Sequence, residues 1–539
     1  LKKGSEATPY SLIEGKVYSP SGFIYASEKS FEGVTFYKND TKIVMTPASG
    51  VIYHIEYSED EKYAAFGGSD RMVTIVDLDK KKKLFALPGN SYITSICFSR
   101  DNKYVFSGSL KNEILMHDVI TGKLIRKFNG SNGSILDLEI SGNDKMLISA
   151  ADDNALRFWD IQTGKLLLTT YYDYEFNYIS FTPDGYFDKS EIFNGSMSWN
   201  YYGTVIKFDQ LFDTYYRPDL IRSILNSEDV KEQSKPSIAK GIYTPPEVTL
   251  QIKRGEEDKR GLIIESISPS DPITQNRVLA NVTVKNTCGE IKGVRLYNND
   301  KLVGEKTVEL SSNIDSTFLI QEFVVDLSNG VNKLRAIGFS KDMTESKGAT
   351  IELSYKSSQI EKPNMYVIAI GINKYKNSKY NLNFCVADMQ GFSDALSLIS
   401  GDLFNKVYVT TITDDDATKE KVIKVFSDYS EKIMPNDVFT FFYAGHGIAL
   451  DANNDPDNLT TEFYYVLRDV IQITDISKTS GNGISGTEMR QMLAKIKANK
   501  QLLFIDACNS GAFAEQFKKR GAAEENALAK LSRATGSTV

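Results

Sequence analysis

The sequence predicts a multidomain protein with three kinds of folding unit: a repeated all-β domain, a small antiparallel sandwich, and an α/β domain with a mostly parallel sheet. Similar phrases recur with a period of about 40 residues, short strands then alternate with turns, and apolar strands finally alternate with amphipathic helices. At 539 residues the chain is too long for one core. We expect domains at 1–210, 244–356 and 362–539, with a helical segment and linker at 211–243.

The composition indicates a globular protein, with 41% hydrophobic and 25% charged residues. The net charge of −7 argues against a nucleic-acid partner, because phosphate binding needs a basic face. The apolar runs fall short of the roughly 18 residues that span a bilayer, so no membrane contact is expected. The chain starts without methionine or an apolar signal core, so targeting information is expected to be missing and a cytoplasmic location is the default.

Two markers define the repeat in the first 190 residues. The first is a hydroxyl residue in a turn, with separations of 39, 41, 42 and 41 between Ser19, Ser58, Ser99, Ser141 and Thr182. The second is an aspartate that closes a strand, with separations of 41 and 42 between Asp77, Asp118 and Asp160. Short alternating strands at this period indicate four-stranded blades.

These phrases resemble the WD-repeat β-propeller family, with Trp159-Asp160 as the one literal signature dipeptide. About five blades are visible. Propellers close with four to eight blades, and seven is usual in this family, so we expect N-terminal blades to be missing. The resemblance implies an interaction platform for a protein partner that the sequence does not identify. Residues 244–356, with short strands broken by Asn, Gly and Ser turns, favour an immunoglobulin-like sandwich that serves as a spacer.

From Met365 onward, apolar strands alternate with amphipathic helices, which predicts a parallel sheet covered on both faces. We expect strands at 365–372, 406–412, 437–445 and 501–508, and helices at 386–400, 418–433 and 486–499.

A histidine and a cysteine follow two of these strands. His446 comes directly after the third strand and Cys508 ends the fourth. Ligands of α/β sheets collect at the carboxyl ends of the strands. We expect the third and fourth strands to be neighbours, so that the imidazole could take the proton of the thiol and create a nucleophile. Of the three histidines, the other two, His54 and His117, lie in the repeat. The alternative is a buried thiol with an unrelated loop histidine.

The remaining cysteines, Cys97, Cys288 and Cys385, are interpreted as structural, and none has the spacing of a metal site. "FYAGHG", followed 62 residues after His446 by Cys508 in "LFIDACNSG", resembles the caspase-like cysteine peptidases, particularly bacterial ones related to metacaspases. "YVIAIGINKY" and "LNFCVAD" fit the same family, and the likeness covers 364–539.

The resemblance implies that His446 is the base, that Cys508 is the nucleophile, and that the backbone N–H groups of Gly447 and Cys508 form an oxyanion hole. It also implies about two further strands beyond the end of this chain. Asp506 stands where animal caspases carry a neutral glutamine, and Asp388 matches a second pocket acid of metacaspase-like members.

Two carboxylates in the pocket would attract arginine or lysine and repel aspartate. The alternatives are that Asp506 caps a backbone turn and that Asp388 is an ordinary acid at a helix start. Lys518, Lys519 and Arg520 are candidate sites of self-cleavage, and the alternative is a helix with solvated charges.

The stretch 451–458 places Asp451, Asn453 and Asp455 at alternate positions, but Pro456 stands where an EF-hand loop needs glycine. We therefore expect no metal there and no cofactor, while calcium dependence stays open. The leading hypothesis is a cysteine endopeptidase that cuts proteins after Arg or Lys and is regulated by its repeat domain. The alternatives are a scaffold whose caspase-like domain only binds, and acyl transfer to another acceptor.

Overall fold

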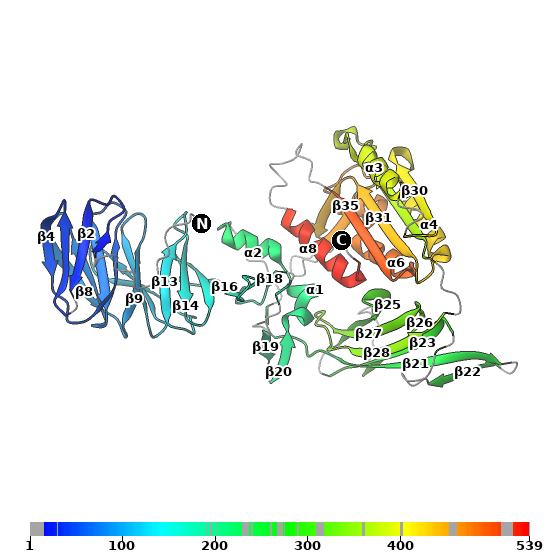
Figure 1. The fold of residues 1–539 in the computed structure, drawn as a ribbon, viewed down its shortest axis with the longest axis horizontal. Helices are drawn as coiled ribbons and strands as arrows, with labels where there is room; N and C mark the ends of the chain where they lie inside the picture. Colours follow the sequence, from blue (N-terminus) through cyan, green and yellow to red (C-terminus); the bar gives the residue numbers. More distant parts are fainter. Residues whose placement is uncertain are drawn as a thin grey trace. The chain divides into compact units, whose positions relative to one another are not determined.

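The structure is a computed structural model that divides into two compact units, Leu1–Gly195 with Leu220–Val230, and Ser196–Asp219 with Lys231–Val539 (Figure 1). It describes residues 16–537 except 30, 191, 194–196, 202, 229–236, 239–240, 259–260, 267–272, 274, 288–289, 309–316, 358–361, 399–402, 452–460 and 508–520.

The first unit is built from successive antiparallel sheets, three with four strands and one with six. The first two sheets contain β1 (Lys16–Tyr18), β2 (Ile24–Lys29), β3 (Gly33–Lys38), β4 (Thr41–Thr46), β5 (Ile52–Tyr57), β6 (Tyr63–Gly68), β7 (Met72–Asp77) and β8 (Lys82–Pro88). The other two contain β9 (Ile93–Phe98), β10 (Tyr104–Ser109), β11 (Ile114–Asp118), β12 (Leu124–Phe128), β13 (Ile135–Ile140), β14 (Met146–Ala151), β15 (Ala155–Asp160), β16 (Leu166–Tyr172), β17 (Tyr178–Phe181) and β18 (Phe187–Lys189).

The repeat markers are turn residues. Ser99 Oγ accepts the N–H of Tyr104 at 2.9 Å and donates to Asp101 at 2.7 Å, and Ser58 makes the corresponding bonds in the preceding sheet. Asp118 Oδ1 accepts the N–H of Thr121 at 2.7 Å, so the aspartate marker fixes the turn that follows the third strand. The markers therefore recur because, in each repeat, a side chain accepts a backbone N–H of the turn that has no partner in the strands.

The number of sheets differs from the sequence prediction. About five blades were expected, whereas the described residues of this unit form four sheets. The fifth marker, Thr182, lies between β17 and β18, and β17 pairs with β16 and so extends the fourth sheet. Two short strands cannot bury a face by themselves, so they add to a neighbouring sheet.

The cores of this unit lie between successive sheets, where Phe36 and Phe66, Ile75 and Ile96, and Phe106 and Trp159 share clusters.

Two sheets handle one buried position differently. Trp159 Nε1 donates to Ser149 Oγ at 2.9 Å in the fourth sheet. In the third sheet His117 and Ser107 occupy the corresponding places, 42 residues earlier, and both are buried. Among the described residues, His117 Nδ1 and Ser107 Oγ have no hydrogen-bond partner. A buried hydroxyl without a partner costs free energy that a methyl group would not.

We predict that Ser107→Ala raises the free energy of unfolding of the first unit by about 0.5 to 1 kcal/mol, because it removes an unpaired hydroxyl. The matched change Ser149→Ala should lower it by about 1 to 3 kcal/mol, because it leaves the Trp159 N–H unpaired. Denaturant unfolding of both variants measures these changes. Equal destabilisation by the two substitutions would contradict the assignment.

The second unit contains a β-sandwich, as the sequence predicts. Its two antiparallel sheets have the strand orders β22-β21-β23-β26 and β25-β24-β27-β28. Leu250, Val282 and Leu296 belong to the cluster between them. The strands are β21 (Glu247–Asp258), β22 (Gly261–Ser266), β23 (Arg277–Lys285), β24 (Ile291–Asn298), β25 (Lys301–Thr307), β26 (Phe318–Asp326), β27 (Gly330–Ser340) and β28 (Ala349–Tyr355).

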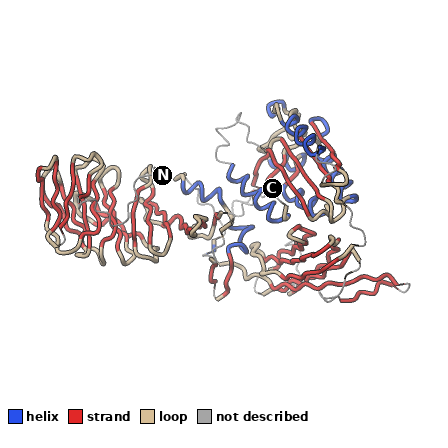
Figure 2. The backbone as a smooth tube through the Cα atoms, in the orientation of Figure 1, coloured by secondary structure: helices blue, strands red, loops and turns tan. Residues whose placement is uncertain are grey.

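The same unit contains the predicted α/β domain, and Figure 2 shows helices gathered around its sheet. The sheet is parallel throughout, in the order β30-β29-β31-β35. Its strands are β29 (Met365–Gly371), β30 (Val407–Thr413), β31 (Val438–Ala444) and β35 (Lys500–Asp506). A smaller sheet contains β32 (Gly447–Asp451), β33 (Thr461–Tyr465) and β34 (Ile484–Ser485). The helices of this domain are α3 (Cys385–Leu398), α4 (Lys419–Lys432), α5 (Ile476–Asn482), α6 (Gly486–Lys495) and α8 (Gly521–Thr535).

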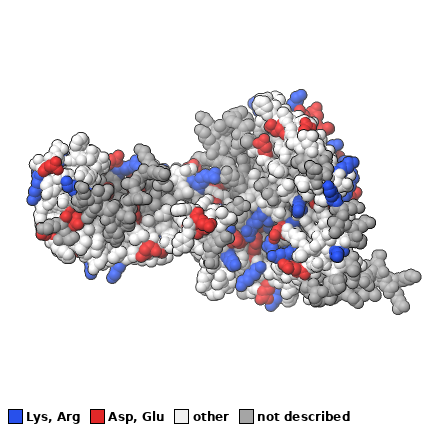
Figure 3. Space-filling view, in the orientation of Figure 1, with Lys and Arg blue, Asp and Glu red and all other residues white. Residues whose placement is uncertain are grey.

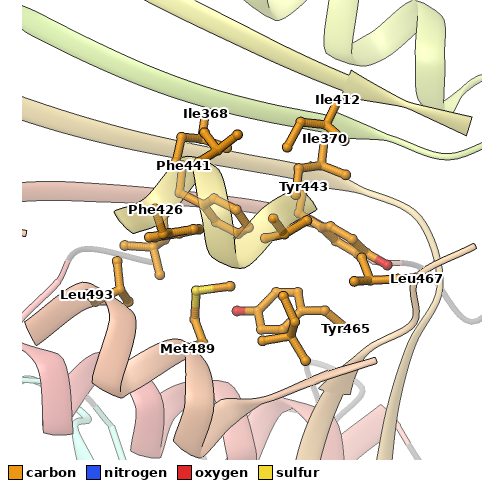
Figure 4. Packing of buried hydrophobic residues seen from close by; sticks show 14 of the residues in the cluster. Ile368, Ile370, Ile412, Phe426, Phe441, Tyr443, Tyr465, Leu467, Met489 and Leu493 are labelled. Carbon is orange, nitrogen blue, oxygen red and sulfur yellow. The ribbon is translucent and has the colours of Figure 1, made fainter. Parts of the chain in front are cut away.

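Alternate residues of the strands face opposite layers. Ile368 and Phe441 pack with Phe426 of α4 and Met489 of α6 on one face (Figure 4). Val367 and Phe442 pack with Met389 of α3 on the other face. The predicted fold class, with its sheet covered on both faces, is thereby confirmed.

Buried ion pairs join the sandwich to its neighbours within this unit. Arg295 of β24 pairs with Asp213 at 3.0 Å and with Glu305 of β25 at 3.3 Å. Asp213 lies in α1 (Phe212–Tyr215), which precedes α2 (Pro218–Leu225), and follows the short strands β19 (Ser198–Tyr201) and β20 (Thr204–Lys207). Glu305 also pairs with Arg490 of α6 at 3.1 Å. A charge chain thus connects α1, the sandwich and the α/β domain.

Elsewhere charges of both signs are interspersed over the visible face of the described residues (Figure 3). No helix among the described residues is long and apolar enough to cross a membrane.

We predict that Arg295→Met lowers the free energy of unfolding of the second unit by about 3 to 5 kcal/mol, because Asp213 stays buried without its cation. Arg277→Met is the control, since Arg277 pairs with Asp326 at 2.8 Å from a largely exposed position and should lose less than about 1 kcal/mol. Calorimetry of the full chain measures both changes. Similar losses in the two variants would show that the buried ion pairs of Arg295 contribute no more to the free energy of unfolding than an exposed pair does.

Candidate active site

The strand that precedes His446 lies directly beside the strand that precedes Cys508. β31 and β35 pair in parallel, from Val438 opposite Lys500 to Ala444 opposite Asp506. Just beyond the end of β31, the N–H of Gly445 donates to the carbonyl of Asp506, the last residue of β35, at 3.2 Å. The prediction that the third and fourth strands are neighbours with a common carboxyl edge is therefore confirmed.

Gly447 brings the two segments into close contact. A Cβ atom on Gly447 would lie 3.0 Å from Ala507 Cβ and 2.6 Å from Phe463 Cζ. The backbone after His446 thus passes closely beside the residue before Cys508, and it does so because position 447 has no side chain.

The imidazole of His446 has a defined orientation. Its Nε2 lies 2.8 Å from the carbonyl oxygen of Tyr380, the last residue of the 3₁₀ turn Ser378–Tyr380. A carbonyl can only accept, so Nε2 carries the proton and Nδ1 keeps its lone pair in the neutral ring. The ring centroid lies 5.1 Å from that of Tyr375 and 6.2 Å from that of Tyr380. His446 is 8% exposed.

The environment keeps this imidazole neutral at physiological pH. Burial lowers the pKa of His446 below its ordinary value of 6.5, and the hydrogen bond to the Tyr380 carbonyl only partly opposes that effect. A neutral ring with a free lone pair can accept a proton from a nearby acid near pH 7. The arrangement therefore suits a general base.

The two predicted pocket acids lie at the same edge of the sheet. Asp506 is the last residue of β35, and Asp388 lies in the first turn of α3. The start of α3 packs on the end of β29, where a Cβ on Gly371 would lie 2.6 Å from the Cys385 carbonyl oxygen. Both carboxylates are exposed. An acid in the first turn of a helix also interacts favourably with the helix dipole, which is a structural reason for Asp388 at this position. The role of Asp388 in a substrate pocket therefore stays a prediction.

Several predicted residues lie outside the described part of the chain: Cys508, Lys518, Lys519, Arg520, Asn453, Asp455 and Pro456. In the described part, no three His, Cys, Asp or Glu side chains gather as metal ligands would. Cys97 is buried in the repeat core, and burial raises the pKa of its thiol well above the ordinary value.

Sequence reasoning missed the tyrosines around His446. Tyr375 and Tyr443 contact the backbone of His446, and Tyr380 contributes its carbonyl. Both tyrosines belong to motifs that the sequence analysis singled out, since Tyr375 ends "GINKY" and Tyr443 begins "YAGHG". Aromatic residues in or beside apolar strands are usually interpreted as core residues, so no role at the site was predicted for them.

The fold and the site define a class of domain, an α/β unit that presents an imidazole at its carboxyl edge beside a strand leading to a cysteine. It is a caspase-family domain, because the family model of the caspase domain matches residues 365–537. The model of the WD domain, G-beta repeat, matches residues 81–118 and 122–160, so the chain also carries WD repeats.

Curated relatives match part of the chain. The WD repeat domain-containing protein 83 homolog of Dictyostelium discoideum is 26% identical over 125 residues, which are 23% of this chain and 38% of that protein. Autophagy-related protein 16 of Arabidopsis thaliana is 27% identical over 138 residues, 25% of this chain and 26% of that protein. The chain thus spans well under half the length of these relatives. A solved structure titled U3-55K aligns at a TM-score of 0.27 with 17% identity, over 32% of this chain and 59% of that chain.

We predict that Gly447→Ala lowers the free energy of unfolding of the second unit by about 1 to 3 kcal/mol, because the new methyl group overlaps Phe463 and Ala507. Gly391→Ala is the control. Gly391 lies in α3 with no atom within 4 Å of its added Cβ, so this change should raise stability by about 0.5 to 1 kcal/mol. Thermal unfolding measures both variants, and an unchanged midpoint for Gly447→Ala would contradict the close approach.

Proposed function

We propose that this protein is a cysteine endopeptidase with His446 and Cys508 as its catalytic pair. The observation that carries the proposal is the parallel pairing of β31 with β35, extended by the hydrogen bond from Gly445 to Asp506. Cys508 follows Asp506 by only two residues in the sequence, and this short separation supports the pairing of its thiol with His446 in the proposal.

In the proposed reaction, His446 Nδ1 takes the proton of the Cys508 thiol, and the thiolate attacks the carbonyl carbon of the scissile peptide bond. The backbone N–H groups of Gly447 and Cys508 donate to the oxyanion that forms. The imidazolium then gives its proton to the leaving amine, which leaves a thioester on the sulfur. Water hydrolyses the thioester, releases the carboxylate product and restores the thiol.

The proposed substrates are proteins with arginine or lysine before the scissile bond. Asp388 and Asp506 support this preference, since both are exposed at the carboxyl edge of the sheet and would pair with a cationic side chain. The motif likeness to bacterial peptidases related to metacaspases supports the same choice. The WD repeats support a protein partner that targets or restrains the peptidase.

The test compares fluorogenic peptides ending in Arg, Lys and Asp, incubated with the full chain and with Cys508→Ala. We expect turnover of the Arg and Lys peptides only, with none by Cys508→Ala. Asp388→Asn and Asp506→Asn should each raise KM for the Arg peptide about 10-fold or more, because each removes a charge-assisted contact.

Glu228→Gln, an exchange of the same kind in the other unit, is the control and should leave KM unchanged. Cleavage of the Asp peptide would overturn the assigned preference. No turnover of any peptide by the full chain with its partner would instead favour a binding scaffold.

A further inference from the structure

Two buried tyrosine hydroxyls meet at the backbone of His446. The hydroxyl of Tyr375 accepts the N–H of His446 at 2.9 Å, and the hydroxyl of Tyr443 donates to the His446 carbonyl at 2.7 Å. Tyr375 is 5% exposed and Tyr443 is fully buried. Both peptide groups that flank the histidine Cα are therefore held by tyrosine side chains, one from the preceding strand β31 and one from 71 residues earlier in the chain.

The contacts form a closed set around the turn. Tyr443 also reaches the carbonyl of Val466 at 2.9 Å, and the N–H of Val466 donates to the His446 carbonyl at 2.9 Å. A Cβ on Gly445 would lie 2.8 Å from the Tyr443 hydroxyl and 2.9 Å from that of Tyr375. Glycine at 445 thus leaves room for the two hydroxyls to converge.

Packing alone does not require these hydroxyls. Tyr465 lies in the same core, with its ring centroid 5.1 Å from that of Tyr443, and its buried hydroxyl has no hydrogen-bond partner among the described residues. The core thus accepts a tyrosine whose hydroxyl makes no bond, whereas those of Tyr375 and Tyr443 converge on one residue, the proposed base. Burial keeps both phenols protonated by raising their pKa.

We propose that Tyr375 and Tyr443 are positioning residues for His446, which fix its backbone so that Nε2–H stays on the Tyr380 carbonyl and Nδ1 is left for the thiol. Tyr375 acts on the ring as well, since the two rings are in contact. This inference rests on the proposed function and names the residues that orient its base. The rate of a reaction that needs a precisely positioned base falls steeply when that base becomes free to move from its working position.

The test uses Tyr375→Phe and Tyr443→Phe, with Tyr465→Phe as the matched control that removes a hydroxyl with no partner. The chain has three histidines, so histidine-labelled protein gives three sets of imidazole signals that His446→Ala assigns. In the parent we expect the Nε2–H tautomer and a pKa below 6.5. In the two test variants water gains access to the ring, so the pKa should move up toward 6.5 and the second tautomer should appear.

Kinetics give a second measurement. With the Arg peptide, kcat should fall about 10- to 100-fold in Tyr375→Phe and Tyr443→Phe, while KM stays within about twofold, because the substrate contacts are untouched. The acid limb of the kcat profile should move to higher pH along with the His446 pKa. Tyr465→Phe should match the parent in every measurement.

Parent-like tautomer and pKa in Tyr375→Phe would overturn the proposal, whatever the unfolding midpoint, since a merely structural hydroxyl changes only stability. If Tyr443→Phe fails to fold, Tyr375→Phe decides. The imidazole titration needs no turnover. A parent that cleaves no peptide therefore rejects the proposed peptidase, while the titration still decides whether the tyrosines orient His446.

Discussion

The parallel pairing of β31 with β35 is the constraint on which the rest of the α/β domain depends. Seven residue pairs in one register bring both strands to the same edge, where Ala444 lies opposite Asp506. A shift of one residue would exchange the faces of the sheet on which Phe441 and Phe442 lie, so that each side chain would leave the cluster in which it packs. Burial of both faces therefore fixes the register, and with it the position along the sheet at which β31 ends and the turn of His446 begins.

Apolar packing sets the layers, but polar contacts set the angles. Hydrophobic burial has no direction, whereas a hydrogen bond to a backbone group does. Within the second unit, buried polar contacts occur where placement matters: at the turn of His446, and along the charges from Asp213 through Arg295 to Arg490. The first set of contacts holds the backbone of His446, and the second joins α6 to the sandwich.

Sequence periodicity predicted the repeat and, in the α/β domain, the four strands of the main sheet with α3, α4 and α6, because alternate burial leaves its mark on every residue of an element. The short strands β32, β33 and β34 and the helix α5 were not predicted. Periodicity failed where neighbours decide the outcome, as at Thr182, whose strands join the preceding sheet instead of starting a new one. At the site, "FYAGHG" predicted His446, and the expectation that the third and fourth strands are neighbours agrees with the pairing of β31 with β35. The Tyr380 carbonyl could not be predicted, because every residue carries one and only the fold selects which one meets the imidazole.

The exposure of Asp388 and Asp506 bears on how a basic preference could arise. Two unit charges at 4 Å attract by about 1 kcal/mol in bulk water and by about 4 kcal/mol near a protein surface, where the effective dielectric constant is about 20. Exposed carboxylates alone therefore discriminate weakly between arginine and aspartate. In the proposed peptidase, a bound peptide would cover the carboxylates and displace their water, so the proposed preference for Arg or Lys would be realised only with substrate in place.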